Sequence, residues 1–304
     1  MSDATWITLG TAGGPPMHAS QSQIANAVVV DGNVYLFDVG NGVLRQLAAA
    51  GLGVRDIRAV FLSHHHMDHN ADVGPVIIST WLFGSGEPAL PVIGPPGTKA
   101  LVDGIVAANA ATVLASFPVD RPAKRALADS VAATDLPREP DGSVLAYEDE
   151  HISVRAMTVD HYQVPPAQPL PEMPVAVGYR VVAGDRLFAY SGDTGPSENL
   201  VRLAEGADIL VTEVVDLEAI ERSLRAMIPD PAPGQIEALV HNMGCNHLTP
   251  QAIGDTAARA AVGHVVLTHY VPAFDDQPDI DAFVRGIAPT YDGQVTPARD
   301  LDHF

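Results

Sequence analysis

The sequence contains a single cysteine, Cys245, among its 304 residues. One thiol excludes both an intrachain disulfide and a metal cluster held by several thiolates. The potential metal ligands are therefore mainly imidazole nitrogens and carboxylate oxygens. We expect Cys245 itself to be a passive thiol.

Basic residues are also scarce, because 17 Lys and Arg stand against 37 Asp and Glu, a formal net charge of −20. Such a charge repels polyanions over the whole molecule. Arg121, Lys124 and Arg125 form the only tight basic group, and Asp120 and Asp129 lie beside it. The composition predicts a small-molecule substrate and no nucleic-acid partner. An anionic substrate is still allowed, because bound metal ions would dominate the local charge.

Long apolar runs are absent as well, since no segment approaches 18 uninterrupted apolar residues. Residues 1–6 lack the basic start and apolar stretch of a secretory signal. These absences predict no membrane partner and a soluble protein in the cytoplasm. The chain is 47% hydrophobic and long enough for a large core, so we expect residues 1–304 to form one domain.

The most informative stretch is residues 64–69, which read His-His-His-Met-Asp-His. They follow the apolar run 59–62, which predicts a buried strand, and precede the turn-rich residues 70–74. Several imidazoles and a carboxylate packed into one turn indicate a metal site.

The spacing within this stretch decides which side chains can share an ion. Side chains alternate along an extended chain, so His64 and His66 face the same way while His65 faces elsewhere. As the chain turns, Asp68 and His69 reach the other side of the same small space. Each pair falls short of the roughly four ligands that zinc prefers, so further ligands must come from elsewhere, with room for two ions.

A His-x-His-x-Asp-His turn after a strand resembles the signature of the metallo-β-lactamase superfamily. His161, Asp193 and His269 each end a predicted strand, and they match in order the remaining ligand positions of that family. A single histidine or aspartate at the end of a strand would be an ordinary loop residue. Three such residues in the order of the family's ligands favour membership of the superfamily.

The resemblance implies two metal positions. It places His64, His66 and His161 on one ion, Asp68, His69 and His269 on the other, and Asp193 between them. Two divalent ions about 3.5–4 Å apart can share a hydroxide nucleophile and clamp a substrate oxygen as Lewis acids. Ligands without thiolate suit zinc, with manganese or iron as alternative occupants, so the expected cofactor is two zinc ions.

Two further stretches resemble one branch of the family, which contains tRNase Z and arylsulfatase-like and cyclic-nucleotide phosphodiesterase-like hydrolases. These are "ITLGTAGGPP" (residues 7–16) and "YLFDVGNG" (residues 35–42). The resemblance implies that Asp38, in the second stretch, supports the metal ligands from behind, because ligating imidazoles need an acceptor for their other N–H. The alternative is a local turn cap.

The stretch "NHLTPQ" carries a second marker of this branch. Thr249 and Pro250 predict the N-cap and first residue of a helix, residues 250–261. The resemblance implies that His247 protonates the leaving group and that Glu213, in the strand "ILVTEVVD", orients it. With the ligand Asp68 they are the predicted catalytic residues. The alternative is that His247 only packs at a helix start and Glu213 is a surface charge.

The long arm by which many tRNase Z proteins grip tRNA has no counterpart here. Only 31 residues separate His161 from Asp193, and residues 164–174 are rich in proline. We interpret this segment as the lip of a small-substrate pocket, with an ordinary surface loop as the alternative. Residues 117–143 read as an insertion with a short helix bounded by Pro122 and Pro137, either a lid or a dimer contact.

The order of predicted strands and helices supports a layered α/β or α+β fold. The resemblance implies a four-layer αββα sandwich of two mixed sheets with outer helices and the metal site along one edge. It also implies a homodimer.

Three functions follow from these patterns. We favour a binuclear zinc hydrolase of a small phosphodiester or sulfate ester, with the hydroxide as nucleophile and His247 as general acid. A zinc hydrolase of a lactone, ester or amide is the alternative, and it ranks second because a general acid matters less for those substrates. A tRNA 3′-processing endonuclease and a metal-binding protein without turnover rank lower.

Overall fold

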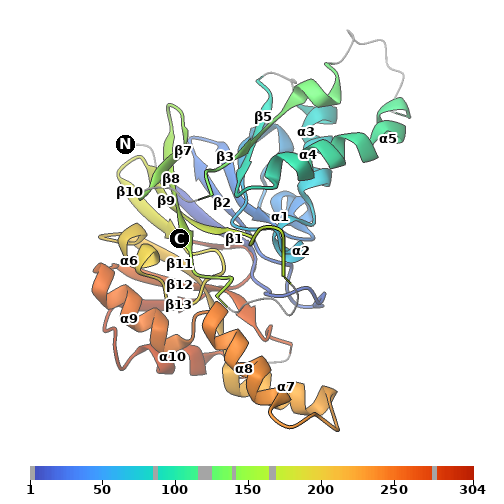
Figure 1. The fold of residues 1–304 in the computed structure, drawn as a ribbon. Coiled ribbons are helices and arrows are strands. Elements are labelled where there is room, and N and C mark those ends of the chain that lie inside the picture. The colour runs from blue at the N-terminus through green and yellow to red at the C-terminus, as the bar shows by residue number, and fades with distance from the viewer. Residues whose placement is uncertain (1–3, 85–87, 116–124, 139–141, 164–168, 276–278) are drawn as a thin grey trace.

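The computed structural model describes residues 4–84, 88–115, 125–138, 142–163, 169–275 and 279–304. These residues form two seven-stranded sheets that pack face to face, with helices on both outer faces (Figure 1). The predicted four-layer αββα sandwich is confirmed.

The first sheet is built mostly from the amino-terminal half. Its strand order is β14 (Asp302–His303), β1 (Thr5–Gly10), β2 (Ala25–Val30), β3 (Asn33–Val39), β4 (Ile57–Phe61), β5 (Leu90–Gly94) and β6 (Val131–Asp135). Strands β3 to β6 run parallel to one another, whereas β1, β2 and β3 form an antiparallel meander. The helices packed on this half are α1 (Val43–Ala49), η1 (Val54–Asp56), α2 (Met67–Asn70), α3 (Val73–Phe83), α4 (Thr98–Ala108), α5 (Ala110–Leu114) and η2 (Leu127–Ser130).

The second sheet repeats this plan with later residues. Its order is β13 (Gln294–Pro297), β12 (His264–Val271), β11 (Ile209–Val215), β10 (Arg186–Tyr190), β9 (Ala176–Ala183), β8 (Ile152–Val159) and β7 (Val144–Glu148). Strands β10 to β13 are parallel. The helices of this half are α6 (Glu198–Leu203), α7 (Leu217–Met227), α8 (Gln235–Asn246), α9 (Pro250–Ala260) and α10 (Asp281–Ile287).

Aromatic rings fill the space between the sheets. The ring centroids of Trp6 and Phe37 lie 5.3 Å apart, and those of Phe37 and Phe61 lie 4.7 Å apart. Tyr179 packs on both phenylalanines from the opposite sheet. Because one apolar face of every inner strand enters this layer, both sheets share a single core.

The parallel strands decide where the site lies. Strands β3 and β4 of one sheet and β10, β11 and β12 of the other end at the same edge of the sandwich. Residues that follow or end these strands therefore converge, which is the usual place for a ligand site in such folds. Two hydrogen bonds tie the sheets together there, from Tyr179 Oη to the Leu62 carbonyl (2.6 Å) and from Val177 N to the Ser63 carbonyl (2.9 Å).

One local prediction is confirmed and another is confirmed in part. Thr249 caps α9, as predicted, by accepting a hydrogen bond from Ala252 N. The short helix predicted between Pro122 and Pro137 is present in the described residues only as the 3-10 helix η2, Leu127–Ser130. Val131–Asp135 form the edge strand β6, because pairing with β5 along its whole length outweighs the local helical preference.

The described part of the segment 117–143 thus belongs partly to the first sheet. Residues 116–124 and 139–141 lie outside the described residues, so a role as lid or dimer contact stays a prediction. Residues 164–168 of the proline-rich segment 164–174 also lie outside them, so its role as the lip of a pocket stays a prediction. None of the described helices is long and apolar enough to cross a membrane.

The turn between β7 and β8 is tied to the first sheet by one carboxylate. Asp149 Oδ2 accepts hydrogen bonds from the hydroxyls of Tyr35 (2.7 Å) and Tyr147 (2.9 Å), and Oδ1 accepts from the amides of His151 and Ile152. Burial raises the pKa of Asp149, but these donors outweigh it and hold the pKa below its usual value.

We expect Asp149→Ala to lower the free energy of unfolding by about 2 kcal/mol near neutral pH, because the buried Tyr35 hydroxyl loses its acceptor. A depressed pKa means that the carboxylate stabilises the fold above its unfolded value of about 3.9 and loses this effect as the pH falls. The difference between variant and parent should therefore shrink below about pH 4, as measured by denaturant unfolding. Glu150→Ala, an exposed neighbour in the same turn, is the control. An unchanged stability of Asp149→Ala would contradict the role of this carboxylate.

Candidate metal centre

Three histidines and an aspartate form the first cluster of potential metal ligands. His64 follows β4, His66 precedes α2 and His161 follows β8. His66 Nδ1 lies 2.9 Å from His64 Nε2 and 3.3 Å from His161 Nε2. With Asp193, which follows β10, each residue offers a ligand atom within 4.8 Å of the others. The structure therefore brings together the residues predicted for the first ion.

Asp68, His69 and His269 form a second cluster beside the first, again with ligand atoms within 4.8 Å of one another. Asp68 and His69 come from the one-turn helix α2, and His269 comes from the end of β12. His269 Nε2 lies 3.1 Å from His69 Nε2 and 3.3 Å from Asp68 Oδ2. These are the residues predicted for the second ion.

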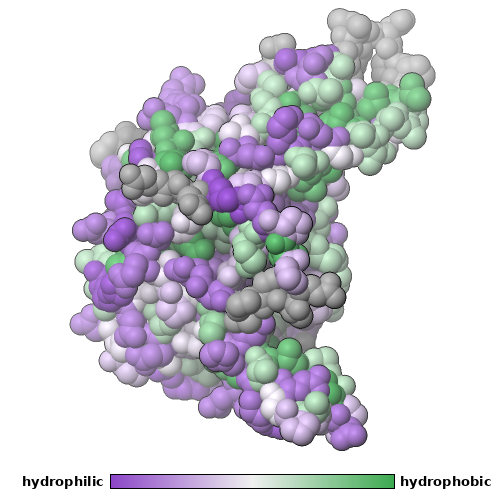
Figure 2. All heavy atoms as spheres, in the orientation of Figure 1, coloured by the Kyte–Doolittle hydropathy of each residue, from purple (hydrophilic) through white to green (hydrophobic). Residues whose placement is uncertain are grey.

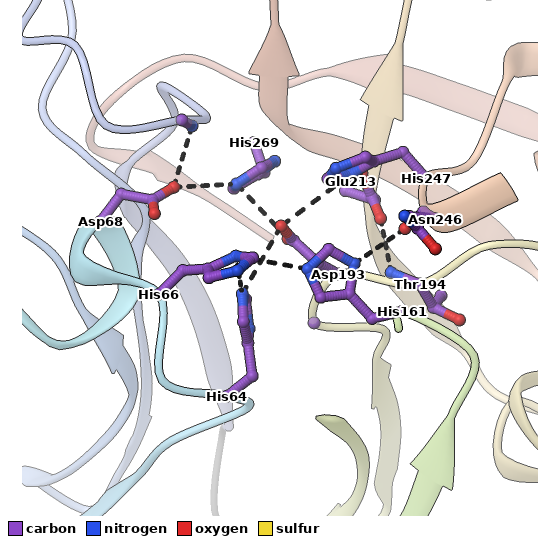
Figure 3. Close-up of polar contacts among 12 residues, drawn as sticks. His64, His66, Asp68, His161, Asp193, Thr194, Glu213, Asn246, His247 and His269 are labelled. Carbon is purple, nitrogen blue, oxygen red and sulfur yellow. Dashed lines mark hydrogen bonds and ion pairs between the residues drawn. The ribbon is translucent and has the colours of Figure 1, made fainter. Parts of the chain in front are cut away.

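Asp193 lies between the two clusters (Figure 3). Its Oδ2 is 3.8 Å from His64 Nε2, and its Oδ1 is 3.4 Å from both His69 Nε2 and His269 Nε2. The side chain is 2% exposed, and Oδ1 makes no hydrogen bond with the described residues. A buried carboxylate oxygen without a donor, facing two imidazoles, fits a cation shared between these side chains. This arrangement matches the bridging position.

His65 lies away from both clusters, as the alternation of side chains predicted. Its Nε2 is 3.3 Å from the Pro95 carbonyl oxygen, on the far side of the strand end. A third group, Asp193, Glu213 and His247, also meets the distance criterion for a metal site. There the facing atoms of Glu213 and His247 are already paired with each other.

The ligands are held from behind by buried hydrogen bonds. Asp38 Oδ2 lies 2.8 Å from His69 Nδ1 and also accepts from the hydroxyls of Ser63 and Tyr190, each at 2.7 Å. His161 Nδ1 donates to the Asn246 carbonyl (2.8 Å). Such contacts fix the ring orientation and the tautomer of a ligating histidine. Asp38 is therefore placed as predicted, and the local turn cap does not describe its contacts.

Backbone conformation also serves the site. His269 has φ 43°, an unusual left-handed conformation beside a register shift between β11 and β12. Its ring packs against Gly13, where an added Cβ would lie 2.6 Å from His269 Nδ1. Only glycine at position 13 lets the loop after β1 approach this ring. Within the stretch "ITLGTAGGPP", glycine at position 13 thus has a steric reason at the site.

Burial and charge set opposite pKa shifts within the centre. Burial first, and His69 second, lower the pKa of His64 well below its usual value, and burial lowers that of His161 to about 4. Burial acts the same way on His69 and His269, but the carboxylates around them, Asp193 first, raise the pKa of both. Neutral imidazoles and ionised carboxylates are the forms that bind metal ions.

His247 and Glu213 form a tight pair next to the clusters. His247 Nδ1 lies 2.6 Å from Glu213 Oε2, and Thr194 N donates to Glu213 Oε1 (2.6 Å). Burial lowers the pKa of His247, but the charge and hydrogen bond of Glu213 outweigh it and raise the pKa to about 9. Glu213 is 1% exposed, so the alternative of a surface charge is wrong.

A cavity of about 730 Å³ opens over the centre. Its floor contains His66, Asp68, Asp193, His247 and His269. One wall is the loop Gly13–Pro16, a second is formed by Val271–Ala273, and a third comes from α7 and α8. Asp68 is tied to the first wall, because Gly14 N donates to its Oδ2 (2.9 Å).

Several residues at the site were missed by the sequence analysis. Ser63, Tyr190, Thr194 and Asn246 support the ligands through contacts between residues far apart in the chain, which no local pattern reveals. The α7 and α8 wall was also missed. Its only signal in the sequence was the spacing of Ile220, Ser223 and Met227 at every third or fourth position.

Comparison with known proteins agrees with this fold and site. Residues 33–270 match a family model described as the beta-lactamase superfamily domain. The chain is 32% identical to Ribonuclease Z from Mycolicibacterium gilvum (strain PYR-GCK) over 302 residues, which is 97% of this chain and 94% of that protein. It is 34% identical to Ribonuclease Z from Mycolicibacterium paratuberculosis (strain ATCC BAA-968 / K-10) over 273 residues, 88% and 86% of the two chains.

Solved structures show the same fold. Human tRNase Z, short form, superposes with a TM-score of 0.68 at 20% identity, covering 99% of this chain and 98% of that one. The metallo-beta-lactamase fold protein YhfI from Bacillus subtilis superposes with a TM-score of 0.66 at 17% identity, with the same coverage.

The sandwich and the paired histidine and aspartate clusters define a metal-dependent hydrolase that acts on ester bonds. The clusters support a centre for two metal ions. The chain belongs to the metallo-β-lactamase superfamily, in its tRNase Z-like branch.

These relatives contradict two expectations from the sequence. A small phosphodiester or sulfate ester ranked above tRNA processing, and a nucleic-acid partner was excluded, yet the curated relatives that match most of the chain are named Ribonuclease Z. Both expectations are wrong. The net charge of −20 describes the whole surface, whereas recognition of a phosphodiester depends on the field at one metal centre.

Proposed function

We propose that this protein is a ribonuclease of the tRNase Z type, which hydrolyses a phosphodiester bond at the 3′ side of precursor tRNA. The observation that carries the proposal is the Glu213–His247 pair beside the two clusters, in a chain that matches Ribonuclease Z over most of its length. An RNA phosphodiester releases a ribose oxygen that needs a proton, and this pair can supply one.

The metal ligands follow from the two clusters. We assign His64, His66 and His161 to one ion, Asp68, His69 and His269 to the other, and Asp193 to both. Six ligands of this kind, with a shared carboxylate and no thiolate, suit zinc, and manganese or iron would fit the same atoms. Two divalent ions bound here supply a nucleophile from water at neutral pH and positive charge for the phosphate oxygens.

The protein's own residues carry the remaining steps. Glu213 holds the Nδ1 proton of His247, which leaves Nε2 for the proton that passes to the departing ribose oxygen. Thr194 N fixes Glu213 in turn. Asp68, tied to Gly14 N, keeps the glycine loop against the centre and so shapes the side from which the substrate enters.

The proposal is tested with purified protein and a precursor tRNA that carries a 3′ trailer. We expect cleavage that separates the trailer, loss of activity with a chelator, and recovery when zinc is added back. The same tRNA without a trailer is the control and should remain intact. A zinc-loaded protein that leaves the precursor uncut would refute the proposal. Homodimerisation and a cytoplasmic location stay predictions.

A further inference from the structure

The wall that α7 and α8 add to the cavity is apolar and directly continuous with the metal centre. Ile220 and Met227 of α7 and Met243 of α8 line the same cavity as Asp193, His247 and His269. On α7 the lining residues Ile220, Ser223 and Met227 recur every three or four positions, so they share one face of the helix.

The opposite face of α7 is charged and faces away from the cavity. Arg225 pairs there with Glu221 (2.6 Å) and with Glu237 of α8 (3.3 Å). Helices α7 and α8 form a helical hairpin, and these exposed pairs lie on its outer side. The apolar face of α7 is therefore the part of the hairpin that meets the substrate. Figure 2 shows hydrophobic residues gathered over this projecting hairpin, next to hydrophilic ones.

No Lys or Arg is among the described residues that line this cavity. The cavity therefore offers an RNA strand no side chain of fixed positive charge with which to hold its backbone, apart from what the metal centre provides. The described residues of this cavity are therefore suited to contacts with sugars and bases beyond the scissile phosphate. Apolar surface next to a phosphate-binding centre fits the flat face of a nucleobase.

Resting on the ribonuclease function proposed above, we propose that Ile220, Met227 and Met243 form a binding surface for one nucleobase next to the scissile phosphate. At about 730 Å³ the cavity lies within the range of about 300–1,000 Å³ that suits small organic ligands, so it has room for a nucleotide. The base must be unpaired to reach it. Methionine adapts its shape and reads no hydrogen-bonding edge, so the surface accepts any base.

Met227 is the residue that tests this surface. It is 70% exposed, so a polar substitution does not disturb the core. Leu239 of α8 is 37% exposed and does not line the cavity, which makes it a matched control on the same hairpin. Met227→Leu keeps an apolar side chain at the same position and should restore what Met227→Ser removes.

The experiment compares kcat/KM for a precursor RNA with that for two RNAs that lack one base, on either side of the scissile bond. For the parent protein we expect one of the abasic RNAs to be cut about tenfold more slowly. In Met227→Ser the complete RNA should slow several-fold and the abasic penalty should shrink, whereas Leu239→Ser should behave like the parent.

The outcomes separate this inference from the proposed function. Equal cleavage of all three RNAs by the parent protein would overturn the base-binding surface and leave the ribonuclease function intact. The base-binding surface would also be overturned if Met227→Ser cut the abasic RNA more slowly than the complete RNA by the same factor as the parent protein does. If the parent cuts none of the RNAs, the ribonuclease function fails and the inference fails with it.

Discussion

Replacing Asp193 by asparagine is expected to remove at least one metal ion per chain and to lower kcat for RNA by a factor of a thousand or more. Its two oxygens face different clusters, with Oδ2 3.8 Å from His64 Nε2 and Oδ1 3.4 Å from His269 Nε2. An amide keeps the shape but presents one oxygen and no charge, so it cannot offer an anionic oxygen to both sides. The measurement is metal content by elemental analysis, together with turnover.

Asp185→Asn serves as the matched control, because Asp185 is exposed in the turn between β9 and β10, on the same hairpin that leads to Asp193. It should bind both ions and retain parental activity. A protein with Asp193→Asn that keeps two ions and full turnover would show that this carboxylate does not bridge the centre.

The second large effect concerns His247. We expect His247→Ala to lower kcat for RNA by about 10²–10⁴-fold, the usual contribution of a general acid. For bis(4-nitrophenyl) phosphate we expect a loss of less than about tenfold, because nitrophenolate departs without a proton. His241→Ala removes an exposed histidine of α8 outside the cavity and should leave both rates unchanged.

Glu213 acts through His247, so it is a positioning residue. Glu213→Gln removes the charge that raises the pKa of His247 while keeping a side chain that can pair with Thr194 N. We expect a loss of kcat with RNA, an almost unchanged KM, and little change with bis(4-nitrophenyl) phosphate. Equal losses on both substrates in either variant would assign the pair to metal binding or folding instead.

The ligand set was predictable because it depends on order along the chain and on the ends of strands. Residues 64–69 follow β4, Asp193 follows β10 and His269 lies near the end of β12. Apolar runs predicted the strand ends, and the family resemblance identified these residues as the ligands. The exclusion of His65 needed only the alternation of side chains in an extended chain. The αββα architecture required the family resemblance as well.

Other features depended on contacts that local patterns do not contain. The strand β6 was not predicted, because it forms where β5 offers a parallel edge to pair with. The apolar wall of α7 and α8 became visible only when these helices were placed beside the centre. The exclusion of nucleic acid was wrong because the net charge does not say where the charged residues lie. The substrate meets only the charges near the site.

The sequence, together with its family resemblance, determined which residues could bind metal, that no cluster of thiolates could take part, and that a layered α/β fold presents the ligands at strand ends. The tertiary structure decided that Asp193 lies between two clusters, that Asp38 supports His69, and that an apolar wall borders the centre. The physical reason is the separation along the chain over which each kind of interaction acts. Periodicity, turns and ligand chemistry act over a few residues, whereas the centre joins side chains more than 200 positions apart, such as His64 and His269, through the packing of two sheets.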